Sequence, residues 1–138
     1  MIQILPNNPE TLALLIAGQK LLKDPSRWCK GSMKQGQSHC INGALFEVGT
    51  ANYKMPDNYV SEDPLYYRGD LNRGQIPEPF WFLRQALKQG SHFTNIGLFN
   101  DDPETKHEQV MQLLKSAIEL VESEMKQSVQ DRLYDRAA

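Results

Sequence analysis

Two cysteines and a histidine lie close together in the first third of the chain, within WCKGSMKQGQSHCINGAL at residues 28–45. Cys29 follows a tryptophan, and His39 directly precedes Cys40. Thiols and imidazoles are the side chains that support nucleophilic catalysis, disulfide exchange and metal binding. The stretch therefore raises three chemical hypotheses, and each depends on which other residues approach it.

The catalytic hypothesis assigns the nucleophile to Cys29. A catalytic thiol needs a nearby base and a third group that orients the base. His39 or His92 could supply the base, and Asn100 or Asp101 could orient it. However, no sharp nucleophile turn is evident around Cys29, and free cysteine is among the most buried residue types. We therefore favour a structural role for this cysteine over an enzymatic one and keep catalysis as an alternative.

The redox hypothesis pairs Cys29 with Cys40. Ten residues, including Gly31 and Gly36, separate them and could bring the sulfurs together. A disulfide requires α carbons within about 7 Å, so a thiol switch stays open until the fold is known.

The third hypothesis is a metal site. Structural zinc sites usually show a Cys-x-x-Cys or His-x-x-x-His pair, and that spacing is missing. We therefore predict no metal and no cofactor.

Length and charge restrict the class of protein. A chain of 138 residues predicts one domain over residues 1–138. The net charge of -2 argues against broad nucleic-acid binding, which needs a basic face. No apolar run approaches the roughly 18 residues of a membrane span, and the first residues do not resemble a secretory signal. Two cysteines without such a signal predict a cytoplasmic location.

Apolar periodicity predicts a mainly α fold of about four helices. We expect Asn8 to cap the first helix and Ser38 the second, and a Thr105–Glu108 capping box to start the last. The predicted helices cover about residues 9–23, 39–48 and 79–89, and the stretch that follows Thr105.

The connecting segments have a different composition. Residues 50–78 are rich in proline, glycine, asparagine and tyrosine, which predicts a long irregular loop. The alternation of apolar residues over 94–99 predicts one short extended segment. The polar stretch 126–138 is expected to be either a tail or an extension of the last helix that could mediate contact between two copies of the chain.

The order of these motifs resembles an uncharacterised family of small bacterial and phage proteins, domain of unknown function 6197. The family pattern combines Trp-Cys-x-Gly, Cys-x-x-Gly-Ala-Leu, an Asn-Asp pair and a long C-terminal helix. The resemblance covers about residues 10–124, with Phe99 at a position where many members have tryptophan. It implies the fold and brings no established activity with it. The matching positions are Trp28, Cys29, Gly31, Cys40, Gly43, Ala44, Leu45, Asn100 and Asp101.

The preferred functional hypothesis is a non-enzymatic module that binds an unidentified protein partner. The expected contact residues are Trp28, Tyr66, Tyr67 and Asn100, on the tyrosine-containing loop and beside residues 28–40. Two alternatives stay open. One is a small enzyme or thiol switch that uses Cys29, and the other is a phage-type inhibitor of a host system, which the resemblance alone suggests.

Overall fold

The computed structural model describes residues 7–52, 73–74 and 76–137, with side chains described through residue 49 in the first range and residue 134 in the last. The described part is mainly α-helical, as the apolar pattern predicts. Its elements in chain order are α1 (Asn8–Leu22), the 3-10 turn η1 (Pro25–Arg27), β1 (Lys34–Gln35), β2 (Ser38–His39), α2 (Ile41–Asn52), α3 (Glu78–Gly90), α4 (Ile96–Asp101) and α5 (His107–Ala137).

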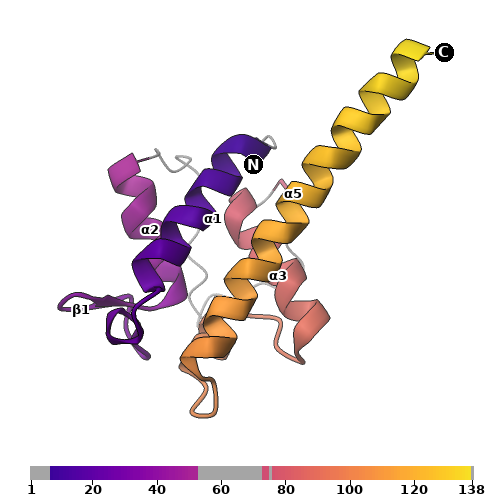
Figure 1. The fold of residues 1–138 in the computed structure, drawn as a ribbon. Coiled ribbons are helices and arrows are strands. Elements are labelled where there is room, and N and C mark those ends of the chain that lie inside the picture. The colour runs from indigo at the N-terminus through magenta and orange to yellow at the C-terminus, as the bar shows by residue number, and fades with distance from the viewer. Residues whose placement is uncertain (1–6, 53–72, 75, 138) are drawn as a thin grey trace.

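The first half of α5 is the centre of the domain. It packs against both α1 and α3, and α1 also packs against α2 (Figure 1). Leu15, Leu45, Leu83 and Leu114, one from each of these four helices, are fully buried in a single core. Burial of this kind contributes about 1.5–3 kcal/mol for each large apolar side chain. The core therefore holds α1, α2, α3 and α5 as one unit.

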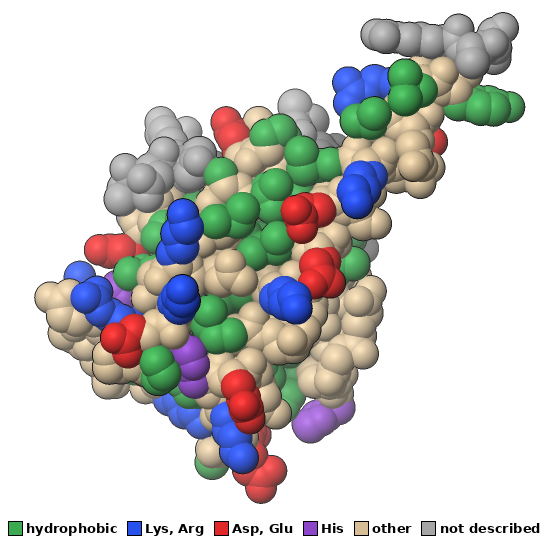
Figure 2. Space-filling view, viewed as in Figure 1, with side chains coloured by type: hydrophobic (Ala, Val, Ile, Leu, Met, Phe, Trp, Pro, Cys, Tyr) green, Lys and Arg blue, Asp and Glu red, His purple; other side chains and the backbone are tan. Residues whose placement is uncertain are grey.

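The second half of α5 projects away from the body (Figure 1). Helix α5 extends well beyond Glu124, so residues 126–137 are an extension of the last helix. Val129, Leu133 and Tyr134 are exposed there, and apolar side chains are visible at this projecting end (Figure 2). Contact between two copies through this helix stays a prediction. Acidic and basic side chains are interspersed on the face shown in Figure 2.

Helix α4 corrects the expectation of an extended segment over residues 94–99. Asn95 accepts a hydrogen bond from the Leu98 backbone N–H at 2.9 Å and so caps a helix that begins at Ile96. Ile96 and Phe99, three positions apart, are both buried, as a helical face requires. The apparent alternation arose because this helix has fewer than two full turns.

The predicted helix ends also need correction. Asn7, rather than Asn8, caps α1, with its side chain accepting from the Glu10 backbone at 3.2 Å. At the start of α5, the Gln109 side chain accepts from the Lys106 backbone N–H at 2.7 Å, one position beyond the predicted capping box. Side chains that can cap occur at several neighbouring positions, so composition alone did not select among them.

Helix α2 starts at Ile41 and ends at Asn52, whereas the expected bounds were 39 and 48. His39 belongs to strand β2, which pairs antiparallel with β1 in a hairpin that the periodicity did not predict. Ser38 does not cap the helix, because its hydroxyl donates to the Ser26 carbonyl at 2.6 Å. Gly49 does not end it either, so glycine here is a residue within the helix.

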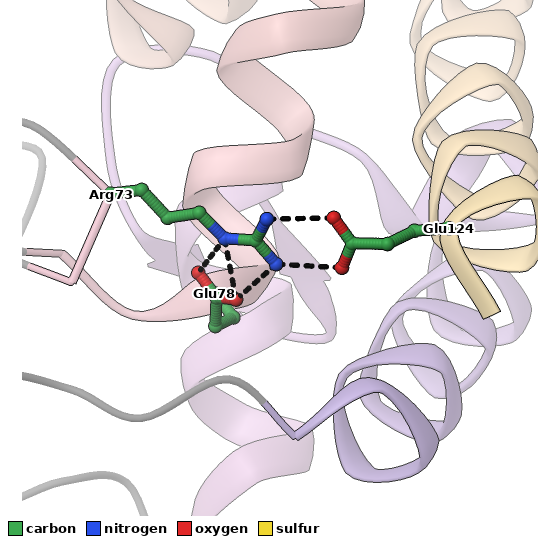
Figure 3. Close-up of polar contacts among 3 residues, drawn as sticks. All are labelled: Arg73, Glu78 and Glu124. Carbon is green, nitrogen blue, oxygen red and sulfur yellow. Dashed lines mark hydrogen bonds and ion pairs between the residues drawn. The ribbon is translucent and has the colours of Figure 1, made fainter. Parts of the chain in front are cut away.

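Arg73 joins α3 to α5 (Figure 3). Its guanidinium donates to both carboxylate oxygens of Glu124 at 2.7 Å and to Oε1 of Glu78 at 2.7 Å. The same group lies over Trp81, 4.6 Å from the ring centroid. Glu78 is almost fully buried at the positively polarised start of α3, which favours a carboxylate there. The predicted loop over 50–78 lies mostly outside the described residues. Arg73, near its end, is held against α3 and α5 by these contacts.

Candidate functional site

Asn100 is the residue that connects the cysteine stretch to the rest of the domain. Its side-chain oxygen accepts from Trp28 Nε1 at 2.7 Å and from the Ile41 backbone N–H at 3.1 Å. Its amide nitrogen donates to the Cys29 carbonyl at 3.0 Å and to Asp101 Oδ1 at 2.9 Å. An asparagine amide has two donors and two acceptor positions, so its capacity is filled. Because Asn100 is 1% exposed, these bonds act inside the protein.

The neighbouring residues reinforce the same junction. Asp101 accepts from the Gly31 backbone N–H at 2.8 Å, and the Lys30 ammonium donates to the Asp102 carbonyl. The Lys30 ammonium also lies 5.4 Å from the centroid of the Trp28 ring, within cation–π range. The turn after α4 is therefore tied to residues 28–31 through side chains and backbone together.

Gly43 allows the β1–β2 hairpin to approach α2. A β carbon at this position would lie 1.9 Å from the Met33 carbonyl oxygen, which belongs to the hairpin backbone. Such a contact is impossible without moving one of the two backbones, so glycine is required here. The Cys40 backbone N–H donates to the same Met33 carbonyl at 3.4 Å. This close approach places the hairpin directly against the first turn of α2.

The two thiols are free and have local partners. Cys29 Sγ donates to the Ser32 carbonyl at 3.5 Å, and Cys40 Sγ accepts from the Gly43 backbone N–H at 3.3 Å. Burial raises the pKa of the Cys29 thiol, and the Asp101 carboxylate raises it further. Burial likewise raises the pKa of Cys40. A nucleophilic cysteine normally has a lowered pKa, so these environments favour the neutral thiol.

His39 is buried, with 5% of its surface exposed, and neither ring nitrogen has a hydrogen-bond partner among the described residues. Burial lowers the pKa of this imidazole, which favours its neutral form. The geometry thus brings Cys29, His39 and Asp101 into one region without a hydrogen bond between thiol and ring. The catalytic assignment stays a prediction. Within the same described residues, no three His, Cys, Asp or Glu side chains are grouped to hold a metal ion.

A groove of about 800 Å³ lies on the domain between α3, α4 and α5. We call it the α3–α5 groove. Its apolar walls include Leu87 of α3, Phe99 of α4 and Leu113 of α5, together with Phe93 from the α3–α4 connection. Phe93 and Phe99 meet edge to face with ring centroids 5.7 Å apart. Ligand-binding clefts are usually 300–1,000 Å³ and mostly apolar, so the groove has the dimensions of a binding site.

The polar rim of this groove has an acidic bias. Asp102 and Glu104 contribute carboxylates, and no lysine or arginine occurs among the described residues that line it. Gln112 is exposed and donates to Ser116 Oγ at 3.1 Å along one edge. His92 also lines the groove and is exposed, and its ring stacks on Phe93 with centroids 4.3 Å apart. The groove therefore combines an apolar floor with a rim suited to a positively charged ligand group.

Two of the four expected binding residues lie within the part of the chain that the structure describes. Trp28 and Asn100 come together at the junction just described, whereas Tyr66 and Tyr67 lie outside the described residues. The α3–α5 groove was missed, because its walls come from separate helices and each apolar residue resembled ordinary core. The available sequence signal was the short separation of Phe93 and Phe99. The expected extended segment over 94–99 hid it, because the two rings meet only when residues 96–101 are helical.

The fold and the groove define a small helical protein in which the end of α4 holds the segments that carry Cys29 and Cys40 and also lines the groove. The chain belongs to a protein family of unknown function, domain of unknown function 6197, whose family model matches residues 6–120. No curated protein and no solved structure gives a significant match to the chain. Of the helices that the structure describes, none combines the length and apolar character needed to cross a bilayer.

Proposed function

We propose that this protein is a non-enzymatic protein-binding module that takes up a short segment of a partner in the α3–α5 groove. The observation that carries the proposal is the groove itself, with its floor of Leu87, Phe93, Phe99 and Leu113. Well-packed apolar pockets supply most of the binding energy at protein interfaces, and aromatic residues are enriched there. An apolar anchor side chain of the partner would fill this floor.

The rim indicates the chemistry of the partner. Asp102 and Glu104 stand beside the apolar floor, none of the described lining residues is lysine or arginine, and Lys30 binds the backbone carbonyl of Asp102 from outside the lining. A basic side chain next to the anchor would meet these carboxylates, whereas an acidic one would be repelled. We therefore commit to a partner segment that carries a large apolar residue flanked by lysine or arginine. Inhibition of a host protein would be one consequence of such binding, so the identity of the partner decides between accessory and inhibitory roles.

The test uses a library of random short peptides displayed on phage and selected on the full-length protein. Selected peptides should be enriched in large apolar residues next to lysine or arginine. Amide chemical shifts of the labelled protein should change around Leu87, Phe93, Phe99 and Leu113 when such a peptide is added. Selection without this composition, or shift changes confined to another surface, would overturn the proposal.

Two matched pairs of variants sharpen the result. Gln112→Trp places a bulky side chain at the groove edge and should weaken peptide binding about tenfold or more, whereas Gln127→Trp, exposed outside the groove, should not. Glu104→Lys should weaken it a few-fold in a salt-dependent manner, and Glu119→Lys should leave it unchanged. Equal effects within either pair would argue against the groove.

A further inference from the structure

We infer that Cys29 and Cys40 form an intrachain disulfide when the protein meets a two-electron oxidant, hydrogen peroxide or a glutathione disulfide. The bond would join the segment that precedes the β1–β2 hairpin to the residue that precedes α2. This inference concerns the cysteine stretch and is independent of binding in the α3–α5 groove. It rests on how the backbone segments that carry the two cysteines are paired.

The first observation is the register of the two segments. Trp28 and His39 form a parallel β-bridge, and the Cys29 backbone N–H donates to the His39 carbonyl at 3.0 Å. Cys29 follows Trp28 and Cys40 follows His39, so the two cysteines are the next pair of facing residues after the bridge. Adjacent strands lie about 4.8 Å apart, and disulfides join α carbons separated by 4.4–6.8 Å. Facing residues of parallel strands also project their side chains to the same side, so the register favours a bond.

The second observation is the side chain of Asn100. Its amide binds the carbonyl of Cys29 and the backbone N–H of Ile41, the residue after Cys40. One buried amide group therefore holds both cysteine-bearing segments in place. Disulfide formation would therefore need no large movement of either backbone.

The electrostatic environment agrees with this proximity. Burial is the main cause of the raised pKa of Cys40, and the neighbouring Cys29 and Asp101 raise the pKa further. Cys29 therefore lies close enough to Cys40 to affect its ionisation. Cys29 is half-buried, whereas Cys40 is 9% exposed, so the oxidant reaches Cys29 first. Because the neutral thiols must lose their protons before reaction, oxidation should become faster as pH rises.

The chemistry balances with peroxide as the oxidant. The Cys29 thiolate attacks one oxygen of hydrogen peroxide, the O–O bond breaks, and a sulfenic acid forms with release of one water. The Cys40 thiolate then attacks the Cys29 sulfur, the S–O bond breaks, and a second water leaves. With a glutathione disulfide, two exchange steps give the same bond and two molecules of reduced glutathione.

The decisive experiment equilibrates the full-length protein in glutathione redox buffers, once folded and once in urea. Mass spectrometry of the alkylated protein measures the fraction that carries the Cys29–Cys40 bond. A flexible chain of this length gives an effective thiol concentration in the millimolar range. The effective thiol concentration in the folded protein should exceed that in urea by about tenfold or more, because the backbone pairing of the two segments holds the thiols together.

Single-cysteine variants provide the controls. Cys29→Ser and Cys40→Ser should each yield only a mixed disulfide with glutathione, and both should remain folded because serine replaces the thiol at similar size. An effective concentration in the folded protein at or below that in urea would overturn the inference. Bonds formed only between two chains would overturn it as well.

Discussion

The indole Nε1 of Trp28 and the side-chain oxygen of Asn100 lie 2.7 Å apart, and this hydrogen bond joins residues that are 72 positions apart in the chain. The same Asn100 amide also reaches Cys29, Ile41 and Asp101. The Trp28 ring also lies near the ring of His107. His107 Nε2 lies 2.7 Å from the Leu22 carbonyl oxygen. Because a carbonyl only accepts, Nε2 carries the proton of this hydrogen bond. The end of α4 is thus connected to residues 28–31 and to α2 through Asn100, and Trp28 and Leu22 are in turn connected to α5 through His107.

Replacement of Asn100 should be strongly destabilising. Asn100→Ala leaves the Trp28 indole, the Ile41 N–H and the Cys29 carbonyl without their partner in a buried site. We expect a loss of about 3 kcal/mol in the free energy of unfolding, measured by urea denaturation. Asn7→Ala, which removes a single exposed cap, should cost about 1 kcal/mol. Equal losses in the two variants would contradict the central role of Asn100.

Two glycine substitutions should have opposite consequences. Gly43→Ala should destabilise the protein by about 2 kcal/mol or more, because its β carbon would overlap the Met33 carbonyl. Gly90→Ala meets open space at the end of α3 and should be neutral or stabilising by up to about 1 kcal/mol. Thermal unfolding of both variants measures the contrast. A Gly43→Ala protein as stable as the wild type would show that the hairpin can move away.

Removal of Arg73 should loosen the attachment of α3 to α5. Arg73→Ala leaves the buried Glu78 carboxylate without its guanidinium partner, and we expect a loss of about 2 kcal/mol. The contact with Glu124 contributes less, because that carboxylate is about one-third exposed. Adding Glu78→Gln to Arg73→Ala should recover part of the loss in a double-mutant cycle. Lys34→Ala, which breaks an exposed pair 3.8 Å from Glu47, should have almost no effect.

His39 should make stability depend on pH. Burial lowers its pKa in the folded state below the ordinary 6.5; the nearby Glu47 opposes this shift, and Lys34 and Arg27 add to it. The unfolded chain therefore binds a proton first as pH falls, so stability should decrease below pH 6.5, by up to about 1.4 kcal/mol per unit. His39→Phe should reduce this slope between pH 7.5 and 5.5, whereas His92→Gln, at an exposed site, should retain it. An unchanged slope in His39→Phe would place the titrating group elsewhere.

The thiols should react slowly in the folded protein. The raised pKa values of Cys29 and Cys40 leave less thiolate at neutral pH than an unfolded chain has. Alkylation by iodoacetamide at pH 7 should therefore be slower in the folded protein than in urea, and Cys40 should be the slower of the two. Rapid modification of Cys29 at neutral pH would instead support the catalytic hypothesis.

Much of the fold could be predicted from local patterns. The spacing of Leu113, Leu114, Ala117 and Val121 predicts the buried face of α5, because a period near 3.6 residues is a property of neighbouring positions. Helix ends were less predictable, since Asn7 and Asn8 can both cap, and only the position of the first turn selects between them. The short helix α4 was missed because its periodic signal is too brief to separate from a strand.

The sequence by itself determined the helical class, the positions of the long helices and the residues that mark the family. Those features follow from periodicity and from the order of residue types along the chain. Only the tertiary structure decided that Asn100 binds Trp28, Cys29 and Ile41, and that Leu87, Phe93, Phe99 and Leu113 surround one groove. Contacts between distant segments depend on how helices pack, and helix packing depends on the shapes of many side chains together rather than on any short pattern.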